Sequence, residues 1–198
     1  MKGLADKEIE ILLLLVKDIS NDYNSNNITK KIKITSAGAF KAMKRLERQK
    51  LIAGKRMGKA IFYKANLDDY YAFRVIETLL INEAREKASR WLHEFTDLYG
   101  HAEIAIIFGS IVNDPKNAND IDLLMIAKKE DNGVIDKIIK ERRTISTRPI
   151  HVIKMTPEDL NASLKRRDEV ILNIIGSCYV LHGYSKLVEA LKNVRSNQ

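Results

Sequence analysis

Two aspartates at alternate positions, Asp120 and Asp122, begin the second of two apolar segments near the middle of the chain. Residues two apart in a strand share a face, so both carboxylates are expected to point the same way. Neighbouring carboxylates repel one another unless a cation or a proton lies between them. Mg²⁺ prefers oxygen ligands and commonly shares them with substrate phosphates. The pair therefore predicts a site for Mg²⁺ and a phosphate-bearing ligand.

The first apolar segment, 104–108, ends directly in Gly109 and Ser110, and nine residues separate Ser110 from Asp120. A glycine at the end of a strand allows close backbone approach, and a serine at a strand-to-helix turn offers N–H and hydroxyl donors to a phosphate. The alternative interpretation is an aspartate pair that caps a loop beside a Gly-Ser turn placed there by chance. Order and spacing together favour the phosphate site.

A hydrophobic strand, Gly-Ser, nine residues and Asp-x-Asp resemble the nucleotidyltransferase superfamily of the DNA-polymerase-beta type. The likeness is greatest to the minimal nucleotidyltransferases, which include the antitoxins of MNT–HEPN pairs. The stretch "TPEDLNASLKRRDEVILNIIGSCYVLHGY" is similar to the closing helices and the final strand of that family. The resemblance covers about 103–187.

The resemblance implies a role for each of these residues. Asp120 and Asp122 would be catalytic and bind Mg²⁺, while Gly109 and Ser110 would bind the nucleoside triphosphate. The implied reaction transfers a nucleoside monophosphate to a hydroxyl of a protein or a small molecule, releases pyrophosphate and uses two metal ions. It also implies a HEPN-type protein partner.

The family's third carboxylate belongs on a later strand, and His151 of "PIHVIKM" stands there. An imidazole serves as a general base near neutral pH, but it is a poor ligand for a hard cation. Two interpretations stay open: His151 is the third catalytic residue, or activity is weakened or lost while nucleotide binding persists. Asp114 and Glu158 are nearby carboxylates, but neither occupies the matching position.

The first third of the chain carries all the excess positive charge. Residues 1–66 hold 15 Lys and Arg against 6 Asp and Glu, a net +9, and the rest of the +8 chain nets −1. Such asymmetry indicates a nucleic-acid-binding module joined to a neutral one. The alternative is a basic surface that only promotes solubility.

The pattern of this basic region predicts a helix over 7–19, a short segment over 28–34, a second helix from Thr35 or Ser36 to about Lys50, and a hairpin over 51–64. Helical spacing directs one face of the second helix to a core. That face is expected to contain Phe40, Met43, Leu46 and Ala39.

This order, and the segment "AFKAMKRLERQKLIAGKRMGKAIFYKAN", resemble the winged helix-turn-helix transcription regulators. The resemblance implies binding of double-stranded DNA, with the second helix in the major groove and the hairpin turn on phosphates. A winged helix that mediates only protein contacts remains the alternative. The DNA-binding residues would be Lys41, Lys44, Arg45 and Arg48 on the helix and Lys55, Arg56 and Lys59 on the hairpin.

The segment 67–100 has helical spacing and ends at a glycine, which predicts one long connecting helix or two shorter ones. A long helix after a wing supports a homodimer on a palindromic site. The expected fold is α/β, with a winged helix over 1–66, the connecting helix over 67–100 and a nucleotidyltransferase-like mixed sheet with flanking helices over 101–198.

Other features narrow the class of protein. The single Cys178 excludes an intramolecular disulfide and is expected to be a buried small side chain. No apolar run approaches a membrane span, so a cytoplasmic protein is expected. Arg142, Arg143 and Arg148 either contact phosphates or belong to a solvated helix end.

The predicted function is a DNA-binding transcriptional regulator whose second domain binds Mg-nucleotide or keeps only the fold; the alternative is an active nucleotidyltransferase.

Overall fold

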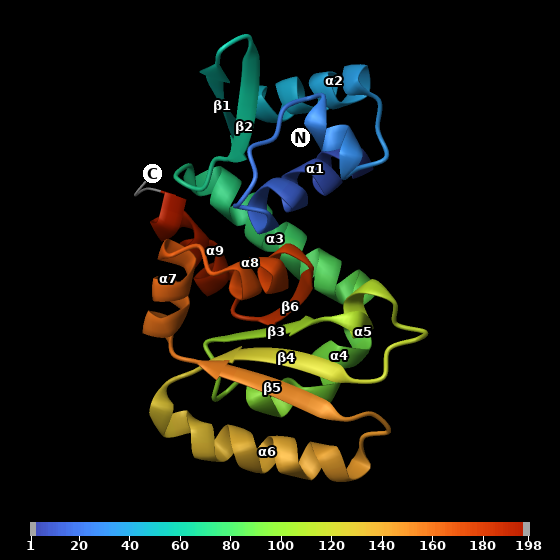
Figure 1. The fold of residues 1–198 in the computed structure, drawn as a ribbon, viewed down its shortest axis with the longest axis vertical. Coiled ribbons are helices and arrows are strands. Elements are labelled where there is room, and N and C mark those ends of the chain that lie inside the picture. Colours follow the sequence, from blue (N-terminus) through green and yellow to red (C-terminus); the bar gives the residue numbers. More distant parts are fainter. Residues whose placement is uncertain (1–2, 196–198) are drawn as a thin grey trace. The chain divides into compact units, whose positions relative to one another are not determined.

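The computed structural model describes residues 3–195, which form mixed α/β structure (Figure 1). These residues contain nine α-helices, a two-stranded hairpin and a four-stranded mixed sheet. The chain divides into two compact units, Met1–Leu79 and Leu80–Gln198, which we call unit 1 and unit 2. The division falls within helix α3 (Tyr70–Lys87).

Unit 1 has the element order expected from the sequence. Its elements before α3 are helix α1 (Asp6–Lys17), a 3-10 turn (Asn27–Lys30), helix α2 (Ser36–Arg48) and strands β1 (Ile52–Met57) and β2 (Ala60–Ala65). The two predicted helices and the hairpin are thus confirmed, with ends that shift by a few residues.

Helix α2 begins where the sequence indicates, because the Thr35 hydroxyl accepts the backbone N–H of Gly38 at 3.1 Å. Its predicted buried face was wrong at one position: Phe40 is 50% exposed. Successive residues turn by about 100°, so Phe40 lies about 120° from Leu46, at the edge of the buried stripe. The small residues complete that stripe instead. The buried residues of α2 are Ala39, Ala42, Met43 and Leu46.

The hairpin of unit 1 is a tight antiparallel pair in which Met57 faces Ala60. Gly58 between them has a φ of +61°, a left-handed conformation that glycine adopts without a steric penalty. No heavy atom lies within 4 Å of where its Cβ would be. The turn is therefore constrained by its backbone conformation alone, and its tip is open to solvent.

Unit 2 is built on a sheet with strand order β5-β4-β3-β6. Strands β4 and β5 pair in parallel, and β3 pairs antiparallel with both β4 and β6. The elements after α3 are α4 (Ser89–Glu94), β3 (Ile104–Phe108), α5 (Ser110–Asn113), β4 (Ile121–Ile126), α6 (Asn132–Ile145), β5 (Ile150–Met155), α7 (Pro157–Lys165), α8 (Glu169–Gly176), β6 (Cys178–His182) and α9 (Tyr184–Arg195).

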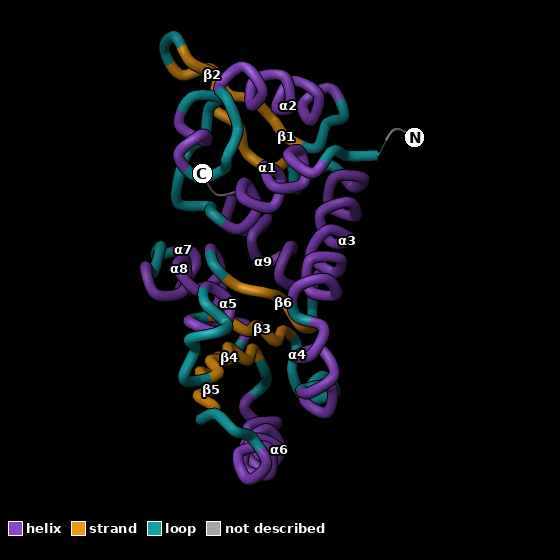
Figure 2. Tube along the Cα trace, turned by 90° about the vertical axis from the view of Figure 1, so that its right-hand side faces the viewer, coloured by secondary structure: helices purple, strands orange, loops and turns teal. Residues whose placement is uncertain are grey.

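The two faces of this sheet bury different side chains. One face packs against α4 and α6, through a core that includes Trp91, Phe95, Ile107, Leu123 and Ile135. The opposite face carries alternate residues of the same strands. Figure 2 shows α7 and α8 on one side of the strands and α4 on the other. Both faces being covered explains why the central strands are continuous apolar runs.

The segment predicted as one or two helices folds as α3 and α4, with a break at Ala88, followed by a 3-10 turn at Thr96–Leu98. Trp91 on α4 is only 9% exposed and stacks on Phe95, so it is a packing residue. Among residues 3–195, no helix is long and apolar enough to cross a membrane.

Candidate functional site

The aspartate pair lies at the N-terminal end of β4, beside the turn that follows β3. The Ser110 hydroxyl donates a hydrogen bond to Oδ1 of Asp120 at 3.0 Å. Asp122 faces Phe108, the last residue of β3, in the antiparallel ladder. The structure therefore brings Gly109, Ser110, Asp120 and Asp122 together at one end of the sheet.

His151 belongs to the same place. It faces Asp122 across the parallel β4–β5 ladder, and Cys178 faces Phe108 across the β3–β6 ladder. Residues in register on neighbouring strands project from the same face of a sheet, so Cys178, Phe108, Asp122 and His151 form one row. His151 is exposed, whereas Cys178 is 2% exposed and hydrogen-bonds Ile175, as expected of a packing residue.

Burial and charge both act on Asp122. Burial raises the pKa of its carboxyl, the neighbouring carboxylate of Asp120 raises it further, and His151 lowers it. The partly buried Asp122 carboxylate therefore retains its negative charge at an energetic cost, which a bound cation would offset. The electrostatics thus favour a cation at this end of the sheet.

Gly109 allows the turn to approach the aspartates. Its φ of 79° and ψ of −151° lie in a region that is essentially restricted to glycine. A Cβ at this position would collide with Oδ2 of Asp122. The absence of a side chain therefore lets the β3–α5 backbone lie directly against the carboxylate pair.

The donor set suits one kind of metal site and not another. Among residues 3–195, no group of three or more His, Cys, Asp and Glu side chains is close enough to hold a metal ion. Neither Asp114 nor Glu158 joins the pair. Mg²⁺ is commonly held by one or two carboxylates together with substrate phosphates. The two aspartates fit one Mg²⁺ that arrives with a nucleotide, and they do not supply the ligands of a two-metal site.

One polar contact at this end of the sheet was missed by the sequence analysis. The Ser177 hydroxyl donates to Oδ1 of Asn113 at 2.6 Å and joins the end of α5 to the start of β6. The two residues are 64 positions apart. No local pattern indicates such a pair, because only the sheet order brings these segments together.

The three arginines considered as phosphate contacts all have internal partners. Arg142 pairs with Asp97 at 2.7 Å. Arg143 donates to the carbonyl oxygen of Ile150, and Arg148 donates weakly to that of Pro115. These contacts favour a structural role.

A second charged site lies on α2 and the hairpin of unit 1, and we call it the basic surface. Lys41 and Arg48 are exposed on α2, and Lys55, Arg56 and Lys59 are exposed on the hairpin. None of the five forms an ion pair within the described part of the chain. Their charges are available to an external anion.

Two predicted members of the basic surface are engaged inside unit 1. Lys44 donates to Glu47 at 2.7 Å and lies 5.9 Å from the ring centroid of Tyr63. Arg45 approaches Oε1 of Glu8 to 3.0 Å, and Glu8 is only 1% exposed. Arg45 thus neutralises a buried carboxylate of α1, which ties α2 to α1.

Exposed side chains on α2 and in the segment before it extend the basic surface beyond the predicted residues. Phe40 projects from the same helix as Lys41 and is half exposed. Lys30, Lys31 and Lys33 are exposed in the segment before α2. The sequence offered a signal for these lysines in their clustering, but they were not singled out.

Comparison with models of protein families, with curated proteins and with solved structures found no match to this chain.

Proposed function

We propose that unit 1 is a winged helix-turn-helix that binds double-stranded DNA, and that the protein is a transcriptional regulator. The observation that carries the proposal is the set of five exposed cations on α2 and the hairpin that lack ion-pair partners within residues 3–195. Two adjacent elements present these cations, and a helix beside a basic hairpin suits a groove flanked by phosphates.

The positions of the side chains suggest how DNA would be bound. Lys41 and Arg48 are two turns apart on one face of α2, so they address the major groove or its phosphates. Lys55, Arg56 and Lys59 on the hairpin contact backbone phosphates. A homodimer would place two such surfaces on a palindromic site.

Salt dependence tests this proposal. If all five cations contact phosphates, log K falls with log salt with a slope of about −4.5, so binding weakens about 500-fold between about 50 and about 200 mM salt. We would measure it by fluorescence anisotropy of a labelled duplex. The Lys41→Glu/Arg48→Glu variant should lose most of the affinity, whereas Lys137→Glu/Lys140→Glu on exposed positions of α6 is the charge-matched control. Equal losses in both variants would contradict a defined surface.

For unit 2 we propose a nucleotidyltransferase-type fold that binds a nucleotide with Mg²⁺. Asp120 and Asp122 would hold the ion, and the Gly109–Ser110 backbone would lie against the phosphates. The contact between Ser110 and Asp120 and the close approach at Gly109 support this assignment. Mg²⁺ would supply charge neutralisation for the phosphates when bound.

The alternative is an active enzyme that transfers a nucleoside monophosphate to a hydroxyl, as an MNT-type antitoxin acts on a HEPN-type partner. The observation that favours it is the register of His151 with Asp122. A neutral imidazole beside the carboxylates can accept the proton of an attacking hydroxyl. The missing third carboxylate counts against it.

Calorimetric titration with each Mg-nucleoside triphosphate distinguishes these outcomes without knowledge of the acceptor. Binding should disappear in Asp120→Asn/Asp122→Asn and persist in Glu158→Gln/Glu169→Gln, which removes the same charge from exposed positions. Label transfer from an α-labelled nucleotide that requires Asp122 and His151 would establish the enzyme. An absence of binding by the wild type would leave unit 2 as a scaffold only.

A further inference from the structure

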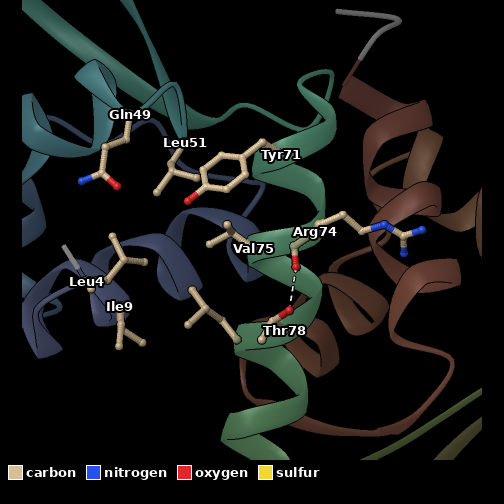
Figure 3. A pocket seen from close by; sticks show the side chains of 10 residues that line it. Leu4, Ile9, Gln49, Leu51, Tyr71, Arg74, Val75 and Thr78 are labelled. Carbon is tan, nitrogen blue, oxygen red and sulfur yellow. Dashed lines mark hydrogen bonds between the residues drawn. The ribbon is translucent and has the colours of Figure 1, made fainter. Parts of the chain in front are cut away.

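Unit 1 contains a cavity that the proposed DNA and nucleotide sites do not use. It has a volume of about 360 Å³ and lies among α1, the α2–β1 connection and α3. Figure 3 shows Leu4, Ile9, Leu51 and Val75 directed toward a common space. All the lining residues belong to unit 1.

The polar groups of the lining are few, and their orientations differ. The Gln49 carboxamide and the Tyr71 hydroxyl point toward the space (Figure 3). The Thr78 hydroxyl donates to the backbone oxygen of Arg74 at 2.9 Å, so its hydrogen is already used. A mostly apolar lining with a small number of polar groups is typical of sites for small organic molecules.

Arg74, the one cation among the described residues of the lining, is directed away from it. The Arg74 guanidinium points away from the other labelled side chains in Figure 3 and pairs with Glu77 at 2.7 Å. It also lies 5.4 Å from the ring centroid of Tyr70. The described residues of the lining thus offer no free positive charge to an anionic ligand, and a neutral ligand does not require one.

We infer that this cavity binds a neutral, largely aromatic molecule with one hydrogen-bonding group, held by the Gln49 carboxamide. A cavity of about 150 Å³ holds benzene, so 360 Å³ accommodates about two fused rings. The carboxamide both donates and accepts, so a carbonyl or a hydroxyl on the ligand can pair with it. This inference does not depend on DNA or nucleotide binding.

Prodan, a neutral naphthalene with one carbonyl and a blue-shifted emission in apolar surroundings, is a suitable probe for the full chain. We expect saturable binding with a blue shift. Val75→Trp should weaken it at least tenfold by filling the cavity, whereas Val134→Trp, the same change at an exposed position of α6, should leave it unchanged. Gln49→Leu should reduce affinity while the blue shift persists.

Circular dichroism of each variant verifies folding, and Thr78→Trp at an exposed position replaces Val75→Trp if the latter does not fold. The inference is overturned if the wild type shows no saturable binding, or if the filled variant binds Prodan as well as the control. Sedimentation of the same variants tests whether a second copy of the chain, rather than a small molecule, occupies the cavity. Self-association that Val75→Trp abolishes, without Prodan binding, would assign the cavity to a second copy of the chain and reject the ligand.

Discussion

The basic surface of unit 1 and the aspartate pair of unit 2 differ in how their charges are assembled. The basic surface comes from one continuous stretch of chain, α2 and the hairpin that follows it. The aspartate pair depends on three paired strands, since Asp122 faces Phe108 on one side and His151 on the other. A charge pattern on contiguous elements therefore shows where a surface lies, whereas a site across a sheet requires the strand order.

The comparison also shows that counting the cations in a segment overstates how many of them are free to bind a ligand. Lys44 and Arg45 have the right spacing, yet Glu47 and Glu8 engage them. At the sheet end, in contrast, the two aspartates have no cationic ion-pair partner within residues 3–195 and are kept close by the fold. The charged residues that can bind a ligand are therefore those that form no ion pair within the fold.

The largest expected effect distinguishes Gly109 from Gly58, two of the three described glycines with positive φ. Gly109→Ala should destabilise unit 2 by about 3 kcal/mol, since it adds backbone strain and a collision with Asp122. Gly58→Ala in the open hairpin turn should cost about 1 kcal/mol. Urea unfolding followed by the fluorescence of the single Trp91 reports on unit 2, and far-UV circular dichroism reports on both units. Equal costs would mean that the Asp122 contact carries no strain.

A second prediction concerns Arg45, the residue of α2 that pairs with Glu8 of α1. Arg45→Ala should lower the free energy of unfolding by about 2 kcal/mol because it leaves the Glu8 carboxylate buried and unpaired. The loss is smaller than for a fully buried pair, since Arg45 is half exposed. Lys41→Ala, the control on the same helix, should change stability by less than about 0.5 kcal/mol.

The double variant Glu8→Gln/Arg45→Ala sharpens the test, because removal of the buried charge should restore most of the loss. If Arg45→Ala instead leaves stability unchanged and weakens DNA binding as much as Lys41→Glu, Arg45 belongs to the basic surface after all. Urea denaturation and anisotropy on the same preparations provide both values.

A third prediction concerns the third carboxylate, which the site lacks and which a substitution at His151 would supply. His151→Asp should strengthen Mg²⁺-dependent nucleotide binding by roughly tenfold, because a third negative charge is added in register with Asp122. Ile153→Asp, two residues further along the same strand face and 40% exposed, is the matched control. Calorimetric titration at several Mg²⁺ concentrations measures the change. Equal gains from both variants would show a general charge effect rather than a site.

The smallest expected effect is a pH dependence of unit 2. Burial, and to a lesser degree Lys186, lower the pKa of His182 below its ordinary 6.5, and its ring stacks on Tyr99. The unfolded chain therefore binds the proton more readily, so the free energy of unfolding should fall as pH drops through 6.5. His182→Gln should flatten this dependence, as measured by Trp91 fluorescence at pH 7.5 and 5.5. An unchanged slope in that variant would assign the dependence to another group.

Much of the fold followed from local pattern. Helical spacing placed α1 and α2, and the apolar pattern around a glycine turn placed the hairpin. The interpretation failed at Phe40, because that residue lies about 120° around the helix from Leu46, at the edge of the buried stripe.

The sequence by itself determined the identities of the charged residues and the elements that carry them, because capping, periodicity and turn chemistry act over a few residues. Only the tertiary structure decided which charges are neutralised. Arg45 meets a carboxylate 37 positions earlier, His151 meets Asp122 across a ladder, and a cavity forms where three segments meet. Such contacts join residues far apart in the chain, and their free energies depend on distance and burial, which no local pattern encodes.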